Sequence, residues 1–367
     1  MSNEPGREVP TVIITGGGTG GHLYPALAVA EEIRRLRPDW NLYFYGRNVE
    51  KEQREVERRG IPFTGLPLQG LRRRFTLENV KALALTIQGL YSCYTSMRHH
   101  PRGAVFGVGG YVSAPAMLSG RFLGWKVALH EQNTIPGLVN RTMARWCDQV
   151  FVTFEKSREY FAGPVIVSGL PIRPELLSRR IQREPEDQKP PSVLVIGGSQ
   201  GARRVVEIAM RAFQILHEQG VPFQALIQTG ERNYEWAGSL PGTQEITLKP
   251  FISDMSEAYN YTDLIVSRAG SSSLSEIAAF GLPSILVPYP YASENHQKVN
   301  AEVFAQAGAA VVYEENQLTA EQLAQEIETL LQDSTRRRKM GEQARTLAYE
   351  ESANIIASHI IELVEHR

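Results

Sequence analysis

Residues 11–25 read TVIITGGGTGGHLYP: a short apolar run, a glycine-rich loop and the start of a segment typical of a helix. The apolar run predicts a buried strand over 11–15, and the residues from Pro25 to about Arg35 predict a helix. A glycine loop between a strand and a helix lets the backbone approach a ligand and leaves helix N-terminal amides free for an anion. The stretch therefore predicts the first strand, loop and helix of a Rossmann-like α/β unit.

The same order of strand, glycine loop and helix returns about half a chain later. Residues 192–202 read SVLVIGGSQGA and run into a second helical pattern. Short apolar runs alternate with helix-length amphipathic segments throughout, which is typical of a parallel sheet covered by helices on both faces. We therefore expect two Rossmann-like domains, over 1–170 and 171–349, separated by a deep cleft.

The remaining apolar runs predict further strands in both domains. The Pro-rich stretch 184–191 is typical of an exposed loop ahead of the second glycine-loop unit. The final segment, Leu347 to Val364, predicts a helix, and we expect the end of the chain, about 350–367, to pack back on the first domain. The other strands are expected near 41–45, 104–108, 126–129, 149–153, 224–228, 245–248, 263–267 and 284–288, and helices near 253–260, 272–280 and 295–307.

The composition of the 367 residues is that of an ordinary soluble protein, 42% hydrophobic and 22% charged. It excludes a disordered or collagen-like chain and a disulfide scaffold. Cys93 and Cys147 lack metal or redox spacing, so we expect two small buried hydrophobic side chains and a reduced, cytoplasmic location. Residues 1–10 contain no apolar core of a secretory signal, and no run approaches the roughly 20 apolar residues of a membrane span.

The formal net charge of −1 hides a division between the two halves. Residues 1–170 carry 21 Lys and Arg against 14 Asp and Glu, whereas residues 171–367 carry 18 against 26. The first half is therefore expected to favour an anionic surface more than the second.

The first glycine loop admits more than one ligand. Its spacing, Gly16-x-Gly18-x-x-Gly21, matches the dinucleotide fingerprint, and Arg47 after the second strand could accept the phosphate of NADP. An NADP-dependent oxidoreductase is therefore one reading of this half. A P-loop is excluded, because its Lys and Ser/Thr positions hold His22 and Leu23.

Two more glycine loops follow strands, at 107–113 and 197–202. Any one of the three loops could be a tight structural turn. Three of them at the carboxyl ends of strands, in two domains, favour a phosphate-bearing ligand in the cleft.

Short motifs follow one another in a fixed order from residue 11 to about residue 313. The ordered set resembles the MurG family of glycosyltransferases. It comprises GGTGGH (17–22), PALAVA (25–30), VGGYVS (108–113), HEQN (130–133), PGLVN (136–140), GGSQGA (197–202), SEIAA (275–279), HQ (296–297) and NA (300–301).

The resemblance implies a GT-B fold, in which two Rossmann-like domains with parallel sheets face a cleft. It implies an inverting enzyme that moves N-acetylglucosamine from UDP-N-acetylglucosamine to the C4 hydroxyl of the N-acetylmuramoyl unit of undecaprenyl-pyrophosphoryl-N-acetylmuramoyl-pentapeptide (lipid I). The product, lipid II, is a peptidoglycan precursor. No cofactor and no metal are implied, and the sequence contains no Asp-x-Asp motif of metal-dependent glycosyltransferases.

The resemblance also implies where such a protein works. The expected location is peripheral, on the cytoplasmic face of the bacterial inner membrane. The expected partners are the two substrates, an anionic membrane surface, and the cell-wall and division machinery, and no nucleic acid is expected.

The donor, by resemblance, is bound mainly by the second domain. Ile252 would read the uracil edge through its backbone, Glu276 would bind both ribose hydroxyls, and Gln297 would bind the transferred sugar. The helix expected near 272–280 would hold the pyrophosphate at its N-terminus. The full donor set is Thr19, Gly20, Gly21, Asn133, Arg173, Ser199, Ile252, Ser271, Ser272, Ser273, Glu276 and Gln297.

Two residues are candidates for the base that deprotonates the acceptor hydroxyl. His22 follows the first glycine loop, and histidine titrates near neutrality. It could instead contact the pyrophosphate of lipid I. Glu131, at the end of a strand that faces the cleft, is the second candidate.

Acceptor and membrane contacts are assigned to the first domain. The resemblance gives the acceptor loop Gly109, Gly110, Tyr111 and Ser113. Residues 71–102 combine six Lys and Arg with an apolar helical stretch, which suits an anionic membrane interface, although a core helix beside a solvated basic loop has the same pattern. The expected membrane residues are Arg72, Arg73, Arg74 and Phe75.

Other readings stay open beside the lipid I transferase. Another GT-B enzyme, such as a glycolipid glycosyltransferase or a UDP-sugar epimerase, shares the fold and would differ in its acceptor. A nucleotide-sugar-binding protein without turnover is the non-enzyme alternative. The second glycine loop and the serine-rich helix start have no role in an NADP enzyme, which weakens that reading.

Overall fold

The computed structural model describes residues 9–18, 20–70, 77–181, 190–198 and 201–366. The chain divides into two compact units. The N-terminal unit comprises Met1–Arg173 together with Glu350–Arg367, and the C-terminal unit comprises Pro174–Tyr349.

The N-terminal unit is built on a parallel sheet with the strand order β3-β2-β1-β4-β5-β6-β7. The central strand β1 is buried along its whole length, between β2 and β4. Helices cover both faces of such a sheet, which is why its strands are nearly continuous apolar runs. The strands are β1 (Thr11–Thr15), β2 (Asn41–Arg47), β3 (Phe63–Leu66), β4 (Ala104–Gly107), β5 (Lys126–Glu131), β6 (Gln149–Val152) and β7 (Val165–Val167).

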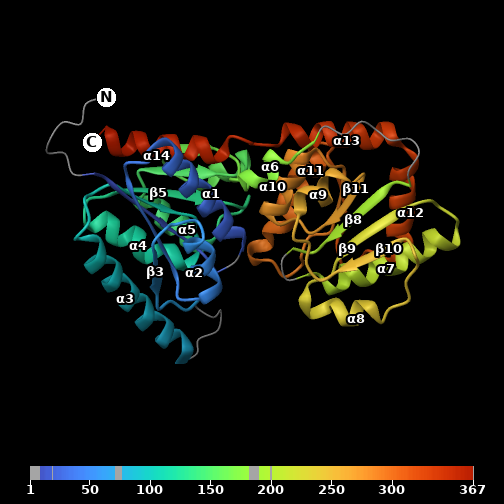
Figure 1. Cartoon of the computed structure of the whole chain (residues 1–367), viewed down its shortest axis with the longest axis horizontal. Helices are drawn as coiled ribbons and strands as arrows, with labels where there is room; N and C mark the ends of the chain where they lie inside the picture. The colour runs from blue at the N-terminus through green and yellow to red at the C-terminus, as the bar shows by residue number, and fades with distance from the viewer. Residues whose placement is uncertain (1–8, 19, 71–76, 182–189, 199–200, 367) are drawn as a thin grey trace. The chain divides into compact units, whose positions relative to one another are not determined.

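One helix of this unit comes from the far end of the chain. Helix α14 lies beside α1 (Figure 1), and its Ile356 and Ile360 are buried in the core between α1 and the sheet. Asn354 Nδ2 donates to Glu32 Oε1 at 2.7 Å. The helices are α1 (Gly20–Leu36), α2 (Glu50–Glu57), α3 (Leu77–Met97), α4 (Gly110–Phe122), α5 (Leu138–Met143), α14 (Ser352–Glu365), and the short 3-10 helices η1 (Ala144–Trp146) and η2 (Glu155–Tyr160).

The second face of this sheet has its own core under α3 and α4. Cys93 is fully buried there and Cys147 is half-buried against it, and burial raises the pKa of each thiol to about 12. The two cysteines therefore behave as the small apolar side chains that the sequence predicts.

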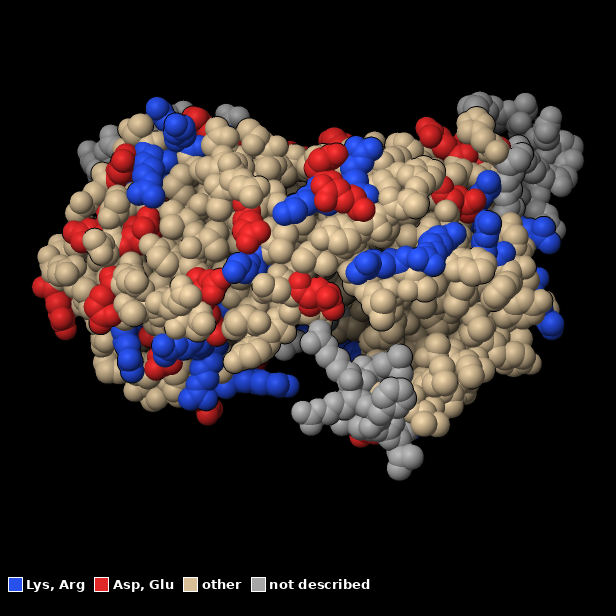
Figure 2. Space-filling model, turned by 180° about the vertical axis from the view of Figure 1, so that it is seen from behind, with Lys and Arg blue, Asp and Glu red and all other residues tan. Residues whose placement is uncertain are grey.

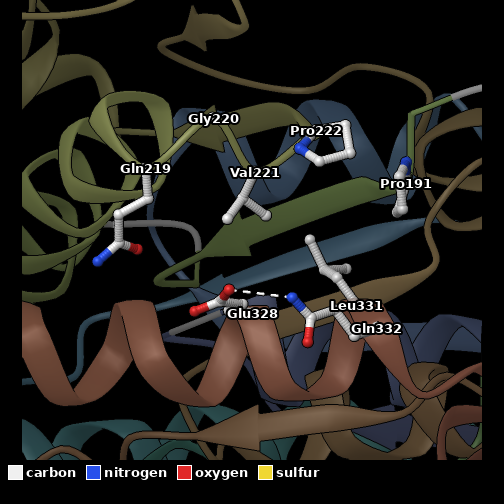
Figure 3. Close-up of a pocket in the computed structure, with 8 residues that line it drawn as sticks. All are labelled: Pro191, Gln219, Gly220, Val221, Pro222, Glu328, Leu331 and Gln332. Atoms are coloured by element: carbon white, nitrogen blue, oxygen red, sulfur yellow. Dashed lines mark hydrogen bonds between the residues drawn. The ribbon is translucent and has the colours of Figure 1, made fainter.

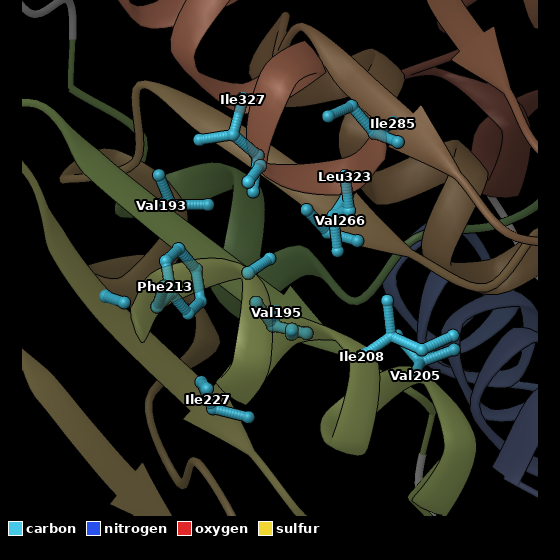
Figure 4. Close-up of a cluster of buried hydrophobic side chains, with 14 of the residues drawn as sticks. Val193, Val195, Val205, Ile208, Phe213, Ile227, Val266, Ile285, Leu323 and Ile327 are labelled. Atoms are coloured by element: carbon cyan, nitrogen blue, oxygen red, sulfur yellow. The ribbon is translucent and has the colours of Figure 1, made fainter. Parts of the chain in front are cut away.

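The C-terminal unit repeats the architecture with the strand order β10-β9-β8-β11-β12-β13. Its core packs α7 and α12 on the sheet, and Val193, Phe213 and Ile327 are among the side chains that fill it (Figure 4). Phe213 is stacked on Phe223 with 5.1 Å between ring centroids. The strands are β8 (Ser192–Ile196), β9 (Gln224–Gln228), β10 (Ile246–Lys249), β11 (Leu264–Ser267), β12 (Ser284–Leu286) and β13 (Ala310–Val312).

The helices of the C-terminal unit alternate with these strands. Two of them, α9 and α10, begin on the loops that carry the expected donor residues. The helices are α6 (Pro174–Ser178), α7 (Arg203–Glu218), α8 (Tyr234–Gly238), α9 (Met255–Asn260), α10 (Ser271–Phe280), α11 (His296–Gln306), α12 (Ala320–Gln332), α13 (Ser334–Thr346), and the 3-10 helices η3 (Glu231–Asn233) and η4 (Ser293–Asn295).

The predicted bounds of β1, β8 and β9 are confirmed, and those of two helices are wrong. Helix α1 begins at Gly20 rather than Pro25, because the last glycines of the loop are already helical and Pro25 lies in the second turn. The helix predicted from Leu347 begins only at Ser352. Leu347 ends α13, where its amide donates to the carbonyl of Ala344, and the chain then passes to the N-terminal unit.

Candidate functional site

The order of each sheet marks where a ligand is expected. In the first sheet, β2 and β3 extend from one side of β1, and β4 to β7 extend from its other side. The strand order therefore reverses its direction between β1 and β4. In the second sheet it reverses in the same way between β8 and β11. Ligands of open parallel sheets bind outside the carboxyl ends of the strands at such a switch point. The segments that follow β1 and β4 therefore form the candidate site of the N-terminal unit, and those that follow β8 and β11 form the candidate site of the C-terminal unit.

In the N-terminal unit the loops after β1 and β4 meet at His22. This side chain lies in the first turn of α1 and is half-buried. Its Nε2 lies 3.9 Å from the position that a Cβ on Gly110 would occupy. Gly110 has φ of 74°, a conformation that glycine adopts without strain. The imidazole is thus held at the mouth of the switch point.

Glu131 ends β5 and is 1% exposed. Its Oε1 accepts from the amide of Asn133 at 2.9 Å, and its Oε2 accepts from Asn140 Nδ2 at 2.6 Å and from the amide of Gly137 at 3.3 Å. Burial raises the pKa of this carboxyl to about 7, against the opposing effect of the donors. Glu131 therefore organises the 133–140 loop from within the protein.

His130, beside it, is completely buried. Its Nε2 pairs with the carbonyl of Gly169 at 2.8 Å, and burial lowers the pKa of the imidazole to about 4. The ring is therefore neutral at physiological pH and acts as a hydrogen-bonding link between β5 and the segment after β7. Asn133 is half-buried, with its Nδ2 3.4 Å from Glu131 Oε1.

The predicted acceptor loop is largely the start of a helix: Gly109 precedes α4 as its N-cap, and Gly110, Tyr111 and Ser113 lie in its first turns. Ser113 is fully buried and its hydroxyl donates to the carbonyl of Gly110 at 3.0 Å, so it supports the first turn of α4 from inside. Tyr111 is half-buried and its hydroxyl lies 3.5 Å from Arg47 Nη1. Gly109 is packed against Asn140, the same amide that binds Glu131.

Glu52 is a residue of this region that sequence reasoning missed. It is buried in α2, and its Oε1 accepts from the amide of Gly18 at 2.9 Å. Arg47 Nη2 lies 3.5 Å from the same oxygen. The carboxylate of Glu52 therefore stabilises the backbone of the first glycine loop through a hydrogen bond. The available signal was the helical spacing of Glu52 and Val56, the two buried residues of a highly charged helix.

In the C-terminal unit the main element is α10, which starts directly after the loop that follows β11. Ser272 and Ser273 lie in its first turn, half-buried, and Ser271 is buried. Glu276 is three residues beyond Ser273, so the two side chains share one face of the helix about 4.5 Å apart along its axis. An anion at the helix start and a pair of hydroxyls one turn along would meet both groups.

Tyr259 is a second residue that sequence reasoning missed. Its hydroxyl donates to Glu276 Oε2 at 2.7 Å. Ile252, seven residues earlier, is buried directly ahead of α9, whereas its neighbour Phe251 is exposed.

Gln297 lies at the start of α11, and its Oε1 accepts from the amide of Tyr289 at 2.9 Å. The two residues Glu294 and Asn295 ahead of this helix have φ of 52° and 54°. Such backbone costs about 1–3 kcal/mol per residue and is concentrated at functional sites.

Arg268, also missed, lies buried at the end of β11. It pairs with Glu315 and donates to the carbonyls of Val287 and Pro288 at 3.1 Å each. It thereby fixes the start of the β12–α11 connection that leads to Gln297.

The other predicted site residues are in the N-terminal unit or outside the described residues. Arg173 is the last residue of the N-terminal unit before α6, and its guanidinium lies 5.1 Å from the ring centroid of Tyr24 in α1. Gly20 and Gly21 form the first residues of α1. Thr19, Arg72, Arg73, Arg74, Phe75 and Ser199 lie outside the described residues, as does most of the 184–191 stretch.

A cavity of about 260 Å³ in the C-terminal unit is separate from these loops (Figure 3). Pro191 and the turn 219–222 line it, with Glu328, Leu331 and Gln332 of α12. These segments precede β8 and β9, so the cavity lies at the amino ends of the strands, away from the switch point.

The charged side chains of the described residues do not gather by sign on the face shown in Figure 2, where basic and acidic side chains are interspersed over both units. No group of three or more His, Cys, Asp and Glu side chains within the described ranges could hold a metal ion. None of the helices that the structure describes is long and apolar enough to cross a bilayer.

Two parallel α/β units, each with a glycine loop and a helix N-terminus at its switch point, define a GT-B type of nucleotide-sugar protein. The glycosyltransferase family 28 N-terminal domain matches residues 12–152, and its C-terminal domain matches residues 192–358. The UDP-N-acetylglucosamine--N-acetylmuramyl-(pentapeptide) pyrophosphoryl-undecaprenol N-acetylglucosamine transferase of Desulforamulus reducens is 38% identical, over 96% of this chain and 97% of its own.

Solved structures agree. Acinetobacter baumannii MurG has a TM-score of 0.79 at 28% identity, over 96% of this chain and 99% of its own. A putative UDP-N-acetylglucosamine 2-epimerase from Listeria monocytogenes has a TM-score of 0.70 at 14% identity, over 98% of both chains, and this likeness extends to the fold alone. The chain belongs to the MurG family, within glycosyltransferase family 28.

Proposed function

We propose that the chain transfers N-acetylglucosamine from UDP-N-acetylglucosamine to the C4 hydroxyl of lipid I, with inversion, and so forms lipid II. The relatives named for this reaction match almost the whole chain, which supports both substrates. The observation that carries the proposal is α10, whose start and first turns offer a pyrophosphate site and a ribose carboxylate on one helical face.

The donor is held by local groups. The amides at the start of α10, with Ser272 and Ser273, take the pyrophosphate, and the positive end of the helix dipole favours its charge. Glu276 accepts from the ribose hydroxyls, the Ile252 backbone reads uracil and Gln297 contacts the sugar. The other members of the donor set predicted from the sequence are Thr19, Gly20, Gly21, Asn133, Arg173, Ser199 and Ser271.

In the transfer step the acceptor oxygen attacks C1 of the sugar as the bond from C1 to the UDP oxygen breaks. The proton of the C4 hydroxyl passes to His22, and the charge on departing UDP is stabilised at the α10 N-terminus. His22 is favoured as the base because its ring is half-exposed at the switch point, whereas Glu131 is buried beneath four donor contacts. Glu131 then acts by positioning Asn133 and the loop beyond it.

The acceptor meets the start of α4, with Tyr111 and the backbone of Gly109 and Gly110. The buried Ser113 supports this first turn. Because Asn140 bonds Glu131 and packs on Gly109, the acceptor loop and the 133–140 loop are supported by the same side chain.

The membrane contact is proposed for α3. Its inner side is buried in the core, with Cys93 and Met97, while an apolar stripe along the other side is between 42% and 70% exposed. The spacing of three and four residues puts this stripe on one helical face. The members of the α3 stripe are Val80, Leu83, Ile87, Tyr91 and Tyr94.

Exposed basic residues accompany the α3 stripe, among them Lys81, Arg98 and Arg102. An apolar helical face with cations beside it suits an interface of anionic lipids. With Arg72, Arg73, Arg74 and Phe75 ahead of the helix, it supports a peripheral position on the cytoplasmic face of the membrane, where the cell-wall and division machinery would also be met.

One assay tests the main proposal. Labelled UDP-N-acetylglucosamine is supplied with a lipid I analogue, and the disaccharide product and UDP are measured. A folded protein that forms neither would defeat the proposal. Label that appears instead in a 2-epimerised nucleotide sugar without acceptor would favour an epimerase.

A further inference from the structure

We propose that Tyr259 is a positioning residue for the donor: its hydroxyl holds the Glu276 carboxylate in the orientation that receives the ribose hydroxyls. The inference rests on the proposed function, in which Glu276 binds ribose. It adds a residue of another helix to the recognition of the uridine nucleotide.

The hydroxyl of Tyr259 is presented from a rigid support. The residue lies in α9 and is 1% exposed, so its ring is fixed by its surroundings. The ring packs on Phe280 of α10 with 5.0 Å between centroids. The hydroxyl reaches Glu276 Oε2 at 2.7 Å, and Glu276 and Phe280 are four residues apart on the same helix. Tyr259 therefore contacts α10 both through its ring and through its hydroxyl.

A glutamate needs such a partner if it is to meet two hydroxyls at once. Its carboxylate is carried by three rotatable bonds, and the contacts around a half-buried side chain decide which rotamers it populates. A hydrogen bond from a fixed tyrosine favours the rotamer that keeps Oε2 beside the hydroxyl. A carboxylate has about four acceptor positions, more than the bond to Tyr259 uses.

The same bond ties together the two segments that handle the nucleoside. Ile252, proposed to read uracil, precedes α9, and Glu276 belongs to α10. Helix α9 is fixed at its start by Asp254, which caps the amide of Glu257 at 3.1 Å. The hydrogen bond of Tyr259 then sets the distance between the base contact and the ribose contact. The site is thereby adapted to a uridine ribonucleotide as one rigid unit.

The test is Tyr259→Phe, which removes the hydroxyl and keeps the ring. The KM for UDP-N-acetylglucosamine should rise about tenfold with kcat within about twofold, because a hydrogen bond to a charged group is lost in ground state and transition state alike. With a 2′-deoxyuridine donor the rise should shrink to about threefold or less, since one of the two hydroxyl contacts is already absent.

The matched control is Tyr313→Phe. The hydroxyl of Tyr313 donates to Glu326 Oε2 at 2.8 Å, so the same kind of bond is removed from the same unit, between the end of β13 and α12. The control should leave KM and kcat unchanged for both donors. A similar KM rise in both variants would overturn the proposal, because it would show a general loss of stability of the unit.

Glu276→Ala separates the inference from the function beneath it. If Glu276→Ala abolishes the preference for the ribose donor over the 2′-deoxyuridine donor and Tyr259→Phe leaves that preference unchanged, the proposed role of Tyr259 is refuted. The ribose contact of Glu276 is then still supported. If Glu276→Ala has no effect on either donor, the ribose site itself fails. In the double variant, Tyr259→Phe should add nothing to Glu276→Ala, and an additive loss would refute an action through Glu276.

Discussion

The buried carboxyl of Glu131 should make the stability of the N-terminal unit depend on pH. Its pKa is about 7 in the folded chain, against an ordinary value of 4.5. The folded state therefore binds this proton more tightly than the unfolded state between the two values. The stabilisation is fully present below pH 4.5 and is lost as the pH rises through 7. The difference of 2.5 pKa units corresponds to about 3 kcal/mol at most.

The perturbation is Glu131→Gln, which keeps the shape and removes the titration. Between pH 5 and pH 8, which covers most of this titration, the wild-type chain should lose about 2–3 kcal/mol more free energy of unfolding than the variant. The variant should also be less stable at every pH, because an amide NH₂ cannot accept from Asn140 Nδ2 and the amide of Gly137, whereas an oxygen of the carboxyl group can in either protonation state. Other titrating groups are common to both proteins and cancel in the comparison.

The assay is denaturant unfolding followed by tryptophan fluorescence. Trp40, Trp125 and Trp146 lie in the N-terminal unit, and Trp236 is the fourth tryptophan of the chain. A Trp236→Phe background therefore restricts the signal to the unit that holds Glu131. Equal pH slopes for the wild-type chain and Glu131→Gln in this background would refute the reasoning, since the four donor contacts would then keep the carboxylate ionised throughout.

His22→Ala should lower kcat about 100- to 10,000-fold while leaving UDP-N-acetylglucosamine affinity within about twofold by calorimetry; a variant that keeps its kcat would exclude His22 as the base. Ile87→Asp with Tyr91→Asp should weaken binding to anionic vesicles at least about tenfold, because each apolar side chain is worth about 1.5–3 kcal/mol when buried. Tyr261→Asp, at an equally exposed tyrosine of the other unit, should not, and equal losses would contradict a specific role of α3. Ile356→Ala should cost about 2–5 kcal/mol of unfolding free energy in the Trp236→Phe background, and a negligible loss would mean that α14 contributes little to the core.

The parts of the fold that sequence predicts are those whose cause is local. β1 and β8 are short, mainly apolar runs that follow a proline and end at a glycine, and both begin and end where predicted. The edge strands β3, β7 and β13 were not predicted, because they are short and depend on a neighbouring strand for their hydrogen bonds.

The candidate site likewise has residues that could be assigned from the sequence and residues that could not. Its glycines and serines could be assigned from the motifs, since loops that follow strands gather at one edge of a parallel sheet. The roles of Glu52 and Tyr259 could not, because each depends on a contact with a residue well separated in sequence, Gly18 and Glu276 respectively. The burial of Glu131 likewise depends on how the 133–140 loop folds back, which the HEQN motif does not reveal.

The position of α14 has a consequence for the order in which the molecule is made. The N-terminal unit is interrupted in sequence by the whole of 174–349, and its core includes Ile356 and Ile360. During synthesis the ribosome produces every strand of both sheets before this helix. The interrupted unit must wait, with part of the core between α1 and the sheet uncovered, until residues 352–365 have been made, whereas the inserted unit can fold as soon as it emerges. A nascent chain halted before Ser352 should therefore expose the apolar face of α1 to chaperones while its other half is already native.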